Sequence, residues 1–218
     1  MQENCVTLHT EKQVCIFSGI MSTAKTRSLL IDVARKLFAQ RGLNGTTMND
    51  IAKASGKGRR TLYAYFANKE DIYAAVIETE VDRISDKMEE VAARDMEPEL
   101  KITTLIYTHL NMVKEAVIRN GNLRAEFFRN IWMVEKVRKA FDHEELELYR
   151  RVIKEGCEKG QFHVESEYLL ADVIHYCIKG LEVPYIFGRL RNGMTEDSSR
   201  PVVVNMVRRM LGVNGTQY

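Results

Sequence analysis

The sequence predicts an all-α protein with a three-helix unit that contains a helix-turn-helix, followed by a unit of about six helices. Apolar residues recur at the 3.6-residue spacing of a helix along most of the chain. Runs of β-branched residues, such as residues 202–204, are short and lie within helical periodicity. Two glycines, Gly56 and Gly58, separate two short helical segments, which is typical of a tight turn between helices.

The first of these short helices has a clear N-terminal signal. Thr47 precedes Met48, and Asp50 follows three positions after Thr47, which is the spacing of a capping box. Ile51 and Ala52 then provide a small apolar face. We therefore expect a helix that begins after Thr47 and ends before the glycine-containing turn.

The second short helix is predicted to bury one stripe and to expose a basic face. Its buried stripe consists of Leu62, Tyr65 and Phe66, at positions i, i+3 and i+4. The side chains that then point away are Arg59, Arg60, Thr61 and Tyr63. A third helix opens at about Lys69, where free backbone N–H groups beside a lysine suit a phosphate group.

The charge of the chain is concentrated around these helices. The overall net charge is only +2, but residues 21–70 carry ten Lys and Arg against three Asp and Glu. Residues 71–218 carry 21 against 25, so the remainder is acidic. A solvated charged face explains any single cluster, but not why the excess coincides with the helix-turn-helix. This asymmetry indicates a protein that meets a polyanion with one surface.

We therefore predict double-stranded DNA as a partner. Arg59 and Arg60 are candidates for contacts with bases or phosphates, since a guanidinium can pair with guanine O6 and N7. Thr47, Tyr63 and Lys69 are assigned to phosphates, whereas Tyr65 has the alternative of being a core residue. The full set of candidate DNA-binding residues is Thr47, Lys57, Arg59, Arg60, Thr61, Tyr63, Tyr65 and Lys69.

The same stretch resembles the DNA-binding domain of the TetR family of bacterial transcriptional regulators. The matching residues are Thr47, Ile51-Ala52, Gly56, Thr61-Leu62-Tyr63, Tyr65-Phe66 and Lys69-Glu70. The resemblance implies a homodimeric repressor that binds a palindromic operator and is released by a small-molecule effector. Lys57, Gly58 and Arg60 depart from the family pattern, and the two cations add charge where DNA would lie.

Composition and periodicity divide the whole chain into three segments. We expect a disordered arm over residues 1–20, the DNA-binding domain over 21–68, with a first helix from Thr23, and the regulatory domain over 69–218. Pro201 is predicted to open the last helix. By the resemblance, the last two helices pair with those of a second chain in a homodimer.

Candidate ligand-contacting residues lie on apolar faces of the regulatory domain. His109 is interpreted mainly as a hydrogen-bonded core histidine, and an aromatic and methionine cluster near residue 130 as core or pocket lining. The candidate pocket residues are Tyr107, His109, Met112, Phe127, Phe128, Trp132, Met133, His175 and Tyr176.

Composition argues against a membrane protein, a cysteine-based metal site and a disulfide framework. No apolar run approaches the roughly 18 residues of a membrane helix, and the four cysteines show no metal-binding or disulfide spacing. We predict a cytoplasmic protein with no cofactor, no metal and no enzymatic activity, because no catalytic motif is legible. The alternative is an all-α ligand-binding protein or enzyme that never contacts DNA.

Overall fold

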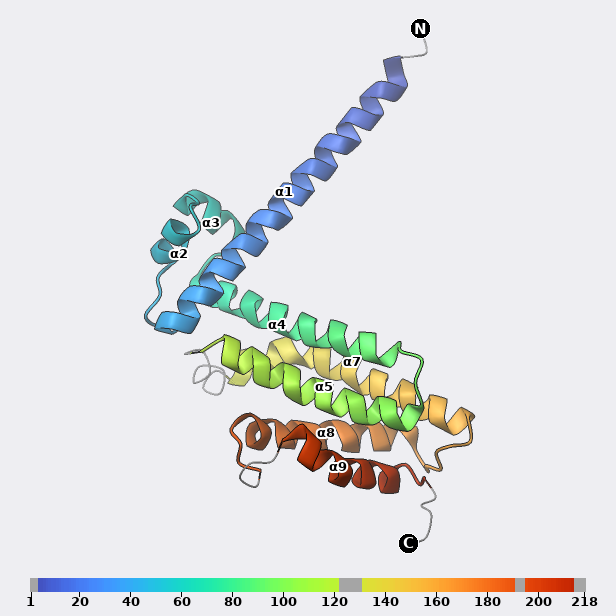
Figure 1. Ribbon diagram of the computed structural model, residues 1–218. Coiled ribbons are helices and arrows are strands. Elements are labelled where there is room, and N and C mark those ends of the chain that lie inside the picture. Colours follow the sequence, from blue (N-terminus) through green and yellow to red (C-terminus); the bar gives the residue numbers. More distant parts are fainter. Residues whose placement is uncertain (1–3, 122–130, 191–194, 214–218) are drawn as a thin grey trace. The chain divides into compact units, whose positions relative to one another are not determined.

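A computed structural model of the chain describes residues 4–121, 131–190 and 195–213; for residues 4–21 and 131–137 it describes the backbone alone (Figure 1). The described residues contain helices and no strand, which confirms the predicted all-α class. The chain divides into two compact units, Met1–Val76 and Ile77–Tyr218. The boundary lies inside a helix, a few residues after the expected one at residue 68.

The N-terminal unit is built from α1 (Asn4–Arg41), α2 (Met48–Ala54), α3 (Arg59–Tyr65) and the first turns of α4 (Lys69–Ala92). Helix α2 packs against both α1 and α3. The aromatic rings of Phe38 and Tyr73 meet edge to face, with centroids 6.3 Å apart. The core residues, all buried, are Leu30, Ile31, Ala34, Phe38, Ile51, Ala52, Leu62, Phe66, Ile72 and Tyr73.

Helix α1 is longer than the sequence pattern indicated. We expected a disordered arm up to residue 20 and a helix from Thr23, whereas the helix already begins at Asn4. Helical hydrogen bonds are local, so a segment without proline can continue an existing helix even where no apolar stripe packs against a neighbour. The absence of periodicity in this segment was therefore a poor argument for disorder.

The second unit contains the rest of α4 and helices α5 (Pro98–Arg119), α7 (Ile131–Glu158), α8 (Glu167–Ile186) and α9 (Glu196–Met210). Helix α5 packs against α7, α8 and α9, and α7 also packs against α8 (Figure 1). Apolar side chains of all these helices form one cluster around residues such as Leu105, Tyr149, Ile153 and Ile178. A predicted short helix over residues 123–129 lies outside the described residues.

Helix α9 begins earlier than predicted. Thr195 is its N-cap and forms a capping box with Ser198, so the helix starts at Glu196 and Pro201 lies inside it. The capping box satisfies backbone N–H groups at the true N-terminus, which outweighs the preference of proline for the first turn. No helix in the described part of the chain has an apolar stretch long enough to cross a membrane.

The core position of Leu62 gives a first testable prediction. Its side chain is fully buried, whereas the neighbouring Tyr63 is 54% exposed. We expect Leu62→Ala to lower the free energy of unfolding of the N-terminal unit by about 2–5 kcal/mol, because it leaves a cavity. Tyr63→Ala should change it by less than about 0.5 kcal/mol. Urea unfolding followed by circular dichroism measures both, and equal effects would contradict this packing.

Candidate nucleic-acid interface and regulatory core

The start of α2 is fixed by a reciprocal pair of hydrogen bonds. The Asp50 backbone N–H donates to Thr47 Oγ1 over 3.2 Å, and the Thr47 N–H donates to Asp50 Oδ2 over 2.9 Å. This is the capping box predicted from the sequence. Hydrogen bonds from the Thr47 side chain and backbone hold the pKa of the Asp50 carboxyl below its usual value. The Thr47 hydroxyl is thus occupied with its own helix while remaining at the exposed surface.

The turn between α2 and α3 requires a glycine at one position. Gly56 has a φ of +64°, a conformation that residues with a Cβ rarely adopt. The Lys57 N–H donates back to the Ala52 carbonyl over 3.2 Å, which closes the turn. Gly58 then serves as the N-cap of α3 with an extended backbone. The two helices are therefore joined by the short, closed turn that the glycines indicated.

Helix α3 buries one face and presents the other to solvent. Leu62 is buried, Arg59, Arg60 and Tyr63 are exposed, and Thr61 is half-buried. The Arg59 Nε donates to Asn49 Oδ1 over 2.9 Å, which connects α3 to α2 and directs the guanidinium along the surface. Two other candidates are half-buried. Tyr65 lies between the exposed and the core alternatives, and Lys57 lies in the turn.

Lys69 has a structural contact that the sequence did not reveal. Its Nζ donates to the backbone carbonyl of Leu43 over 3.0 Å and so holds the loop after α1. The start of α4 is capped by Asn68, whose Oδ1 accepts the Asp71 N–H over 2.8 Å. Any contact of Lys69 with a phosphate would therefore compete with, or add to, its bond to Leu43. Nearby, the Arg27 guanidinium lies over the Phe66 ring, 5.4 Å from its centroid.

The candidate pocket residues of the second unit do not form one group. Tyr107, His109 and His175 are buried, Met112 is half-buried, and Tyr176 is 65% exposed, so Tyr176 does not line an interior pocket. The Tyr107 hydroxyl is 2.7 Å from Ser199 Oγ of α9. Phe127 and Phe128 lie outside the described residues. Trp132 and Met133 lie in α7, where only the backbone is described.

A chain of ionisable groups, all buried except the half-buried Arg138, runs through the core of the second unit, and we call it the charge network. It consists of Arg138, Glu182, His109, Glu145 and His175, contributed by α5, α7 and α8. His109 Nδ1 lies 2.7 Å from Glu145 Oε1, and its Nε2 lies 3.0 Å from Glu182 Oε1. Arg138 Nη1 donates to Glu182 Oε2 over 3.1 Å. The prediction that His109 is a hydrogen-bonded core histidine is confirmed.

Electrostatic interactions inside the network favour its charged forms. Burial opposes the charged His109 ring, but the negative charge of Glu145 and hydrogen bonds with Glu145 and Glu182 raise its pKa to about 9. Burial likewise raises the pKa of Glu145, yet the charge and hydrogen bond of His109 lower it to about 2. Hydrogen bonds from His109 and Arg138 lower the pKa of Glu182 to about 2 against the effect of burial. Arg138, Glu182, His109 and Glu145 are therefore ion-paired at neutral pH.

The carboxylates of the network were missed in the sequence analysis. Glu145 lies on the same stripe of α7 as Phe141, Leu148 and Val152, all of which are buried. Glu182 follows Ile178 by four residues on the buried face of α8. A carboxylate within an apolar stripe is the signal that would have identified both, since buried carboxylates are almost always paired.

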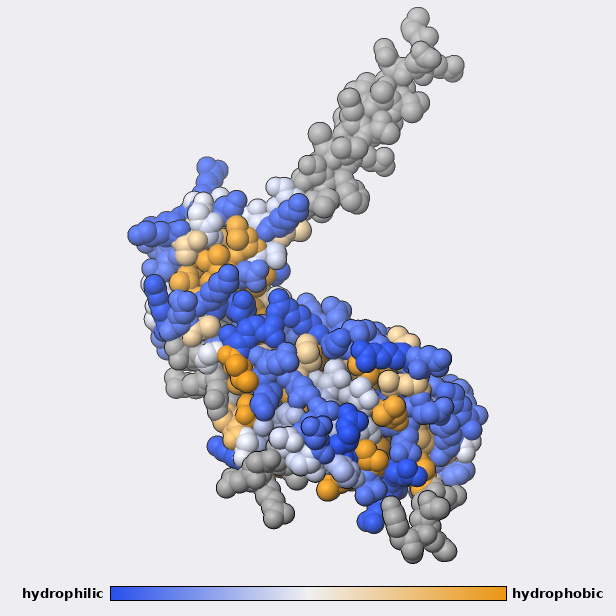
Figure 2. Space-filling model, viewed as in Figure 1, coloured by the Kyte–Doolittle hydropathy of each residue, from blue (hydrophilic) through white to orange (hydrophobic). Residues whose placement is uncertain are grey.

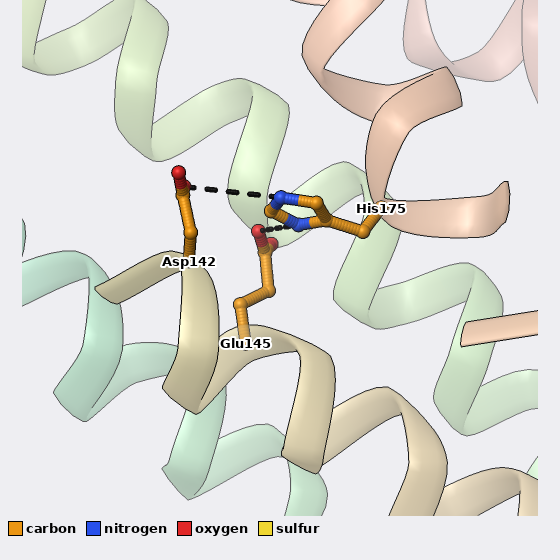
Figure 3. A group of neighbouring side chains, drawn as sticks. All are labelled: Asp142, Glu145 and His175. Atoms are coloured by element: carbon orange, nitrogen blue, oxygen red, sulfur yellow. Dashed lines mark hydrogen bonds and ion pairs between the residues drawn. The ribbon is translucent and has the colours of Figure 1, made fainter. Parts of the chain in front are cut away.

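Next to the network, three potential metal ligands come together. Asp142, Glu145 and His175 each offer a ligand atom within 4.8 Å of the others (Figure 3). The sequence analysis assigned no metal, because the residues lie on two helices and show no ligand spacing. An open hollow lies nearby on the surface between α4 and α7, with Ser85, Glu89 and Glu144 among its lining residues. None of the candidate pocket residues whose side chains are described lines this hollow.

Exposed apolar side chains collect on α8 and α9. Leu169, Val173 and Tyr176 follow one another at i, i+4 and i+7 along α8, and Val202 and Met206 do so at i and i+4 along α9. Their exposed fractions lie between 41% and 65%. We call these five residues the α8–α9 stripe. On the face drawn in Figure 2, apolar patches are interspersed with hydrophilic residues.

Comparison with known proteins shows a sequence similarity over part of the first unit. The sequence profile of bacterial regulatory proteins of the tetR family matches residues 30–76. An uncharacterised HTH-type transcriptional regulator of Mycobacterium tuberculosis is 36% identical over 86 residues, covering 39% of this chain and 43% of that protein. The HTH-type transcriptional repressor ComR of Escherichia coli is 41% identical over 63 residues, 29% of this chain and 30% of ComR. The chain thus matches less than half the length of these relatives.

Solved structures resemble the chain over most of its length. A transcriptional regulator of the TetR/AcrR family from Thermobifida fusca has a TM-score of 0.60 and 25% identity, covering 88% of this chain and 98% of the other. The regulator FadR from Bacillus subtilis, solved in complex with stearoyl-CoA, has a TM-score of 0.57 and 20% identity, with 87% and 99% covered. At 20% identity, the similarity to FadR concerns the fold alone.

Removing one carboxylate tests the energetic role of the charge network. In Glu182→Ala, the buried cations Arg138 and His109 lose a shared partner, and leaving buried charge unpaired costs about 3–5 kcal/mol. We therefore expect a large drop in the melting temperature of the second unit. Glu90→Ala is the control, because Glu90 pairs with Lys87 and Arg94 at an exposed site and should change little. Similar melting temperatures for both variants would contradict the network.

Proposed function

We propose that the chain is a ligand-responsive transcriptional regulator of the TetR family, acting as a repressor. In this proposal it binds a roughly palindromic operator as a twofold dimer and releases it when a small molecule binds the second unit. The observation that carries the proposal is the exposed basic face of α3, held by a capped α2 and a closed glycine turn. Such a protein works in the cytoplasm, beside the chromosome.

The proposed contacts place α3 in a major groove of each half-site. Arg59 and Arg60 have the length and charge to reach base edges or phosphates. We assign Thr47, Tyr63 and Lys69 to phosphates, which set the position of the helix rather than its sequence preference. Thr61 and Lys57 lie at the edge of this surface, and Tyr65 contributes only with its exposed part. The excess of cations over residues 21–70 supports this surface as the one that meets DNA.

The proposed dimer uses the α8–α9 stripe. Five partly exposed apolar residues on two neighbouring helices leave a surface that a second copy of the same face would cover, giving a four-helix bundle. A twofold pair is also what a palindromic operator requires. The exposed apolar area and the twofold geometry of a palindromic operator support the dimer independently.

The proposed effector binds within the second unit. Release of DNA requires only that the effector bind the conformation incompetent for DNA more tightly than the competent one. The description of FadR as a complex with stearoyl-CoA supports a small-molecule effector for this fold. The chain's own interior differs by its charge network, so the chemistry of the effector is not carried over from FadR.

Replacing one arginine tests the DNA face. We expect Arg60→Ala to weaken binding to duplex DNA several-fold at low salt and, if Arg60 contacts a phosphate, to reduce the salt slope by about one. Arg94→Ala removes the same charge from an exposed position of the second unit and should have no such effect. Fluorescence anisotropy with the genomic fragment selected by the protein, and with random duplexes, measures both. Unchanged affinity for both DNAs would remove Arg60 from the interface.

The salt dependence of the unmodified protein separates the proposal from its alternative. A protein with several phosphate contacts loses orders of magnitude in affinity between about 50 and 200 mM salt. An all-α ligand-binding protein or enzyme without DNA binding would show no affinity for random duplexes at either salt concentration.

A charge placed in the α8–α9 stripe tests the dimer. Leu169→Glu would bury an unpaired carboxylate in the proposed interface, so we expect the dimer dissociation constant to rise at least about tenfold. Ile118→Glu is the matched control, because Ile118 is 68% exposed on α5, outside the stripe. Light scattering after size exclusion gives the mass of each species. A dimer that persists equally in both variants would exclude this stripe as the interface.

A further inference from the structure

The imidazole of His175 is held between two carboxylates that it meets differently. Its Nδ1 lies 2.8 Å from Glu145 Oε2, whereas its Nε2 faces Asp142 Oδ1 at 3.8 Å (Figure 3). Asp142 and Glu145 project from α7, and His175 projects toward them from α8 (Figure 3). His175 is 1% exposed and Glu145 is 2% exposed. The ring is therefore fixed in orientation by a hydrogen bond at one nitrogen only.

That hydrogen bond determines which nitrogen carries the lone pair. A carboxylate accepts, so Nδ1 must carry the proton that it donates to Glu145, and Nε2 of the neutral ring is an acceptor. Across the gap, Asp142 Oδ1 is also an acceptor. Among the described residues, neither Nε2 nor this Oδ1 has a hydrogen-bond partner, although both atoms are buried. Two facing buried acceptors are unfavourable unless a proton, a water molecule or a metal ion lies between them.

We propose that His175 Nε2 and Asp142 Oδ1 bind a divalent transition-metal ion of the zinc type. Zinc ligands lie about 2.0–2.2 Å from the ion for nitrogen and oxygen, so two ligand atoms 3.8 Å apart fit one ion slightly off the line between them. Glu145 then has the role of the carboxylate that accepts the second N–H of a metal-binding histidine, which orients the ring and raises its basicity.

The surroundings define what kind of ion the site takes. Imidazole with carboxylate favours zinc, nickel or copper over magnesium and calcium, which prefer oxygen alone. Lys179 Nζ donates to Asp142 Oδ2 over 2.6 Å, which holds the carboxylate with Oδ1 toward the gap but also weakens binding of a cation. Both Glu145 oxygens already face imidazole nitrogens, Oε1 at 2.7 Å from His109 Nδ1 and Oε2 at 2.8 Å from His175 Nδ1, so Glu145 orients the ring and is not a ligand. The remaining coordination positions are open to water or to a donor group of a small molecule.

The experiment measures zinc binding by the full-length, tag-free chain after removal of metal with a chelator. Competition with a chromophoric chelator should give one zinc ion per chain, and zinc but not magnesium should raise the melting temperature. We expect Asp142→Asn and His175→Gln each to weaken zinc binding at least tenfold. His143→Gln should not, because His143 is an exposed neighbour of Asp142 on α7.

Two outcomes would overturn the proposal. One is that the unmodified chain binds no zinc. In that case a proton on Nε2 makes the ring an imidazolium, which pairs with Asp142 Oδ1. The other is equal zinc affinity in the unmodified chain and in Asp142→Asn. Asp142 is half-buried, so this variant decides the question even if His175→Gln fails to fold. The readout involves no DNA, so its failure is separate from a failure of the proposed regulatory function.

Discussion

The stability of the second unit depends on interactions that offset the cost of burying the carboxylates of Glu145 and Glu182. Removing a carboxylate from water is expensive, and both residues lie among the apolar side chains that hold α5, α7 and α8 together. Their charges are tolerated because His109 lies between them and Arg138 pairs with Glu182. The partners come from three helices, so the ion pairs form only when those helices have their native register. The network therefore favours one register of these three helices.

The N-terminal unit uses charge in the opposite way. Cations lie at the surface around α3, and some of them contact uncharged groups of the same unit: Arg59 bonds to Asn49, and Lys69 bonds to Leu43. Such contacts position a side chain without neutralising it, because an amide oxygen or a carbonyl carries no net charge. The unit consequently keeps a positive field for a polyanion. In the second unit, by contrast, the charges of Glu182 and Arg138 neutralise each other internally.

The features that the sequence predicted well are those encoded locally. The capping box at Thr47, the turn at Gly56 and the buried position of Leu62 each depend on residues a few positions apart, and all three are present. The charge network was missed because Glu145 and Glu182 meet His109 only after three helices pack. Tyr176 was misplaced for a related reason: helical periodicity identifies an apolar face, but not whether that face meets the core or another molecule. The contacts with DNA and effector stay predictions.

Helix α4 belongs to both units and contacts α7 within the second unit. Helix α4 starts at Lys69 in the N-terminal unit and continues to Ala92 in the second, so the units share one continuous helix. Within the second unit, Ser85 donates to Glu144 over 2.8 Å, and Arg151 donates to Glu89. Glu144 is the direct neighbour of Glu145 on α7. A molecule or ion that shifts α7 at Asp142 or Glu145 therefore acts on a helix that already contacts α4. These contacts link the charge network, through α7, to the helix that continues into the N-terminal unit.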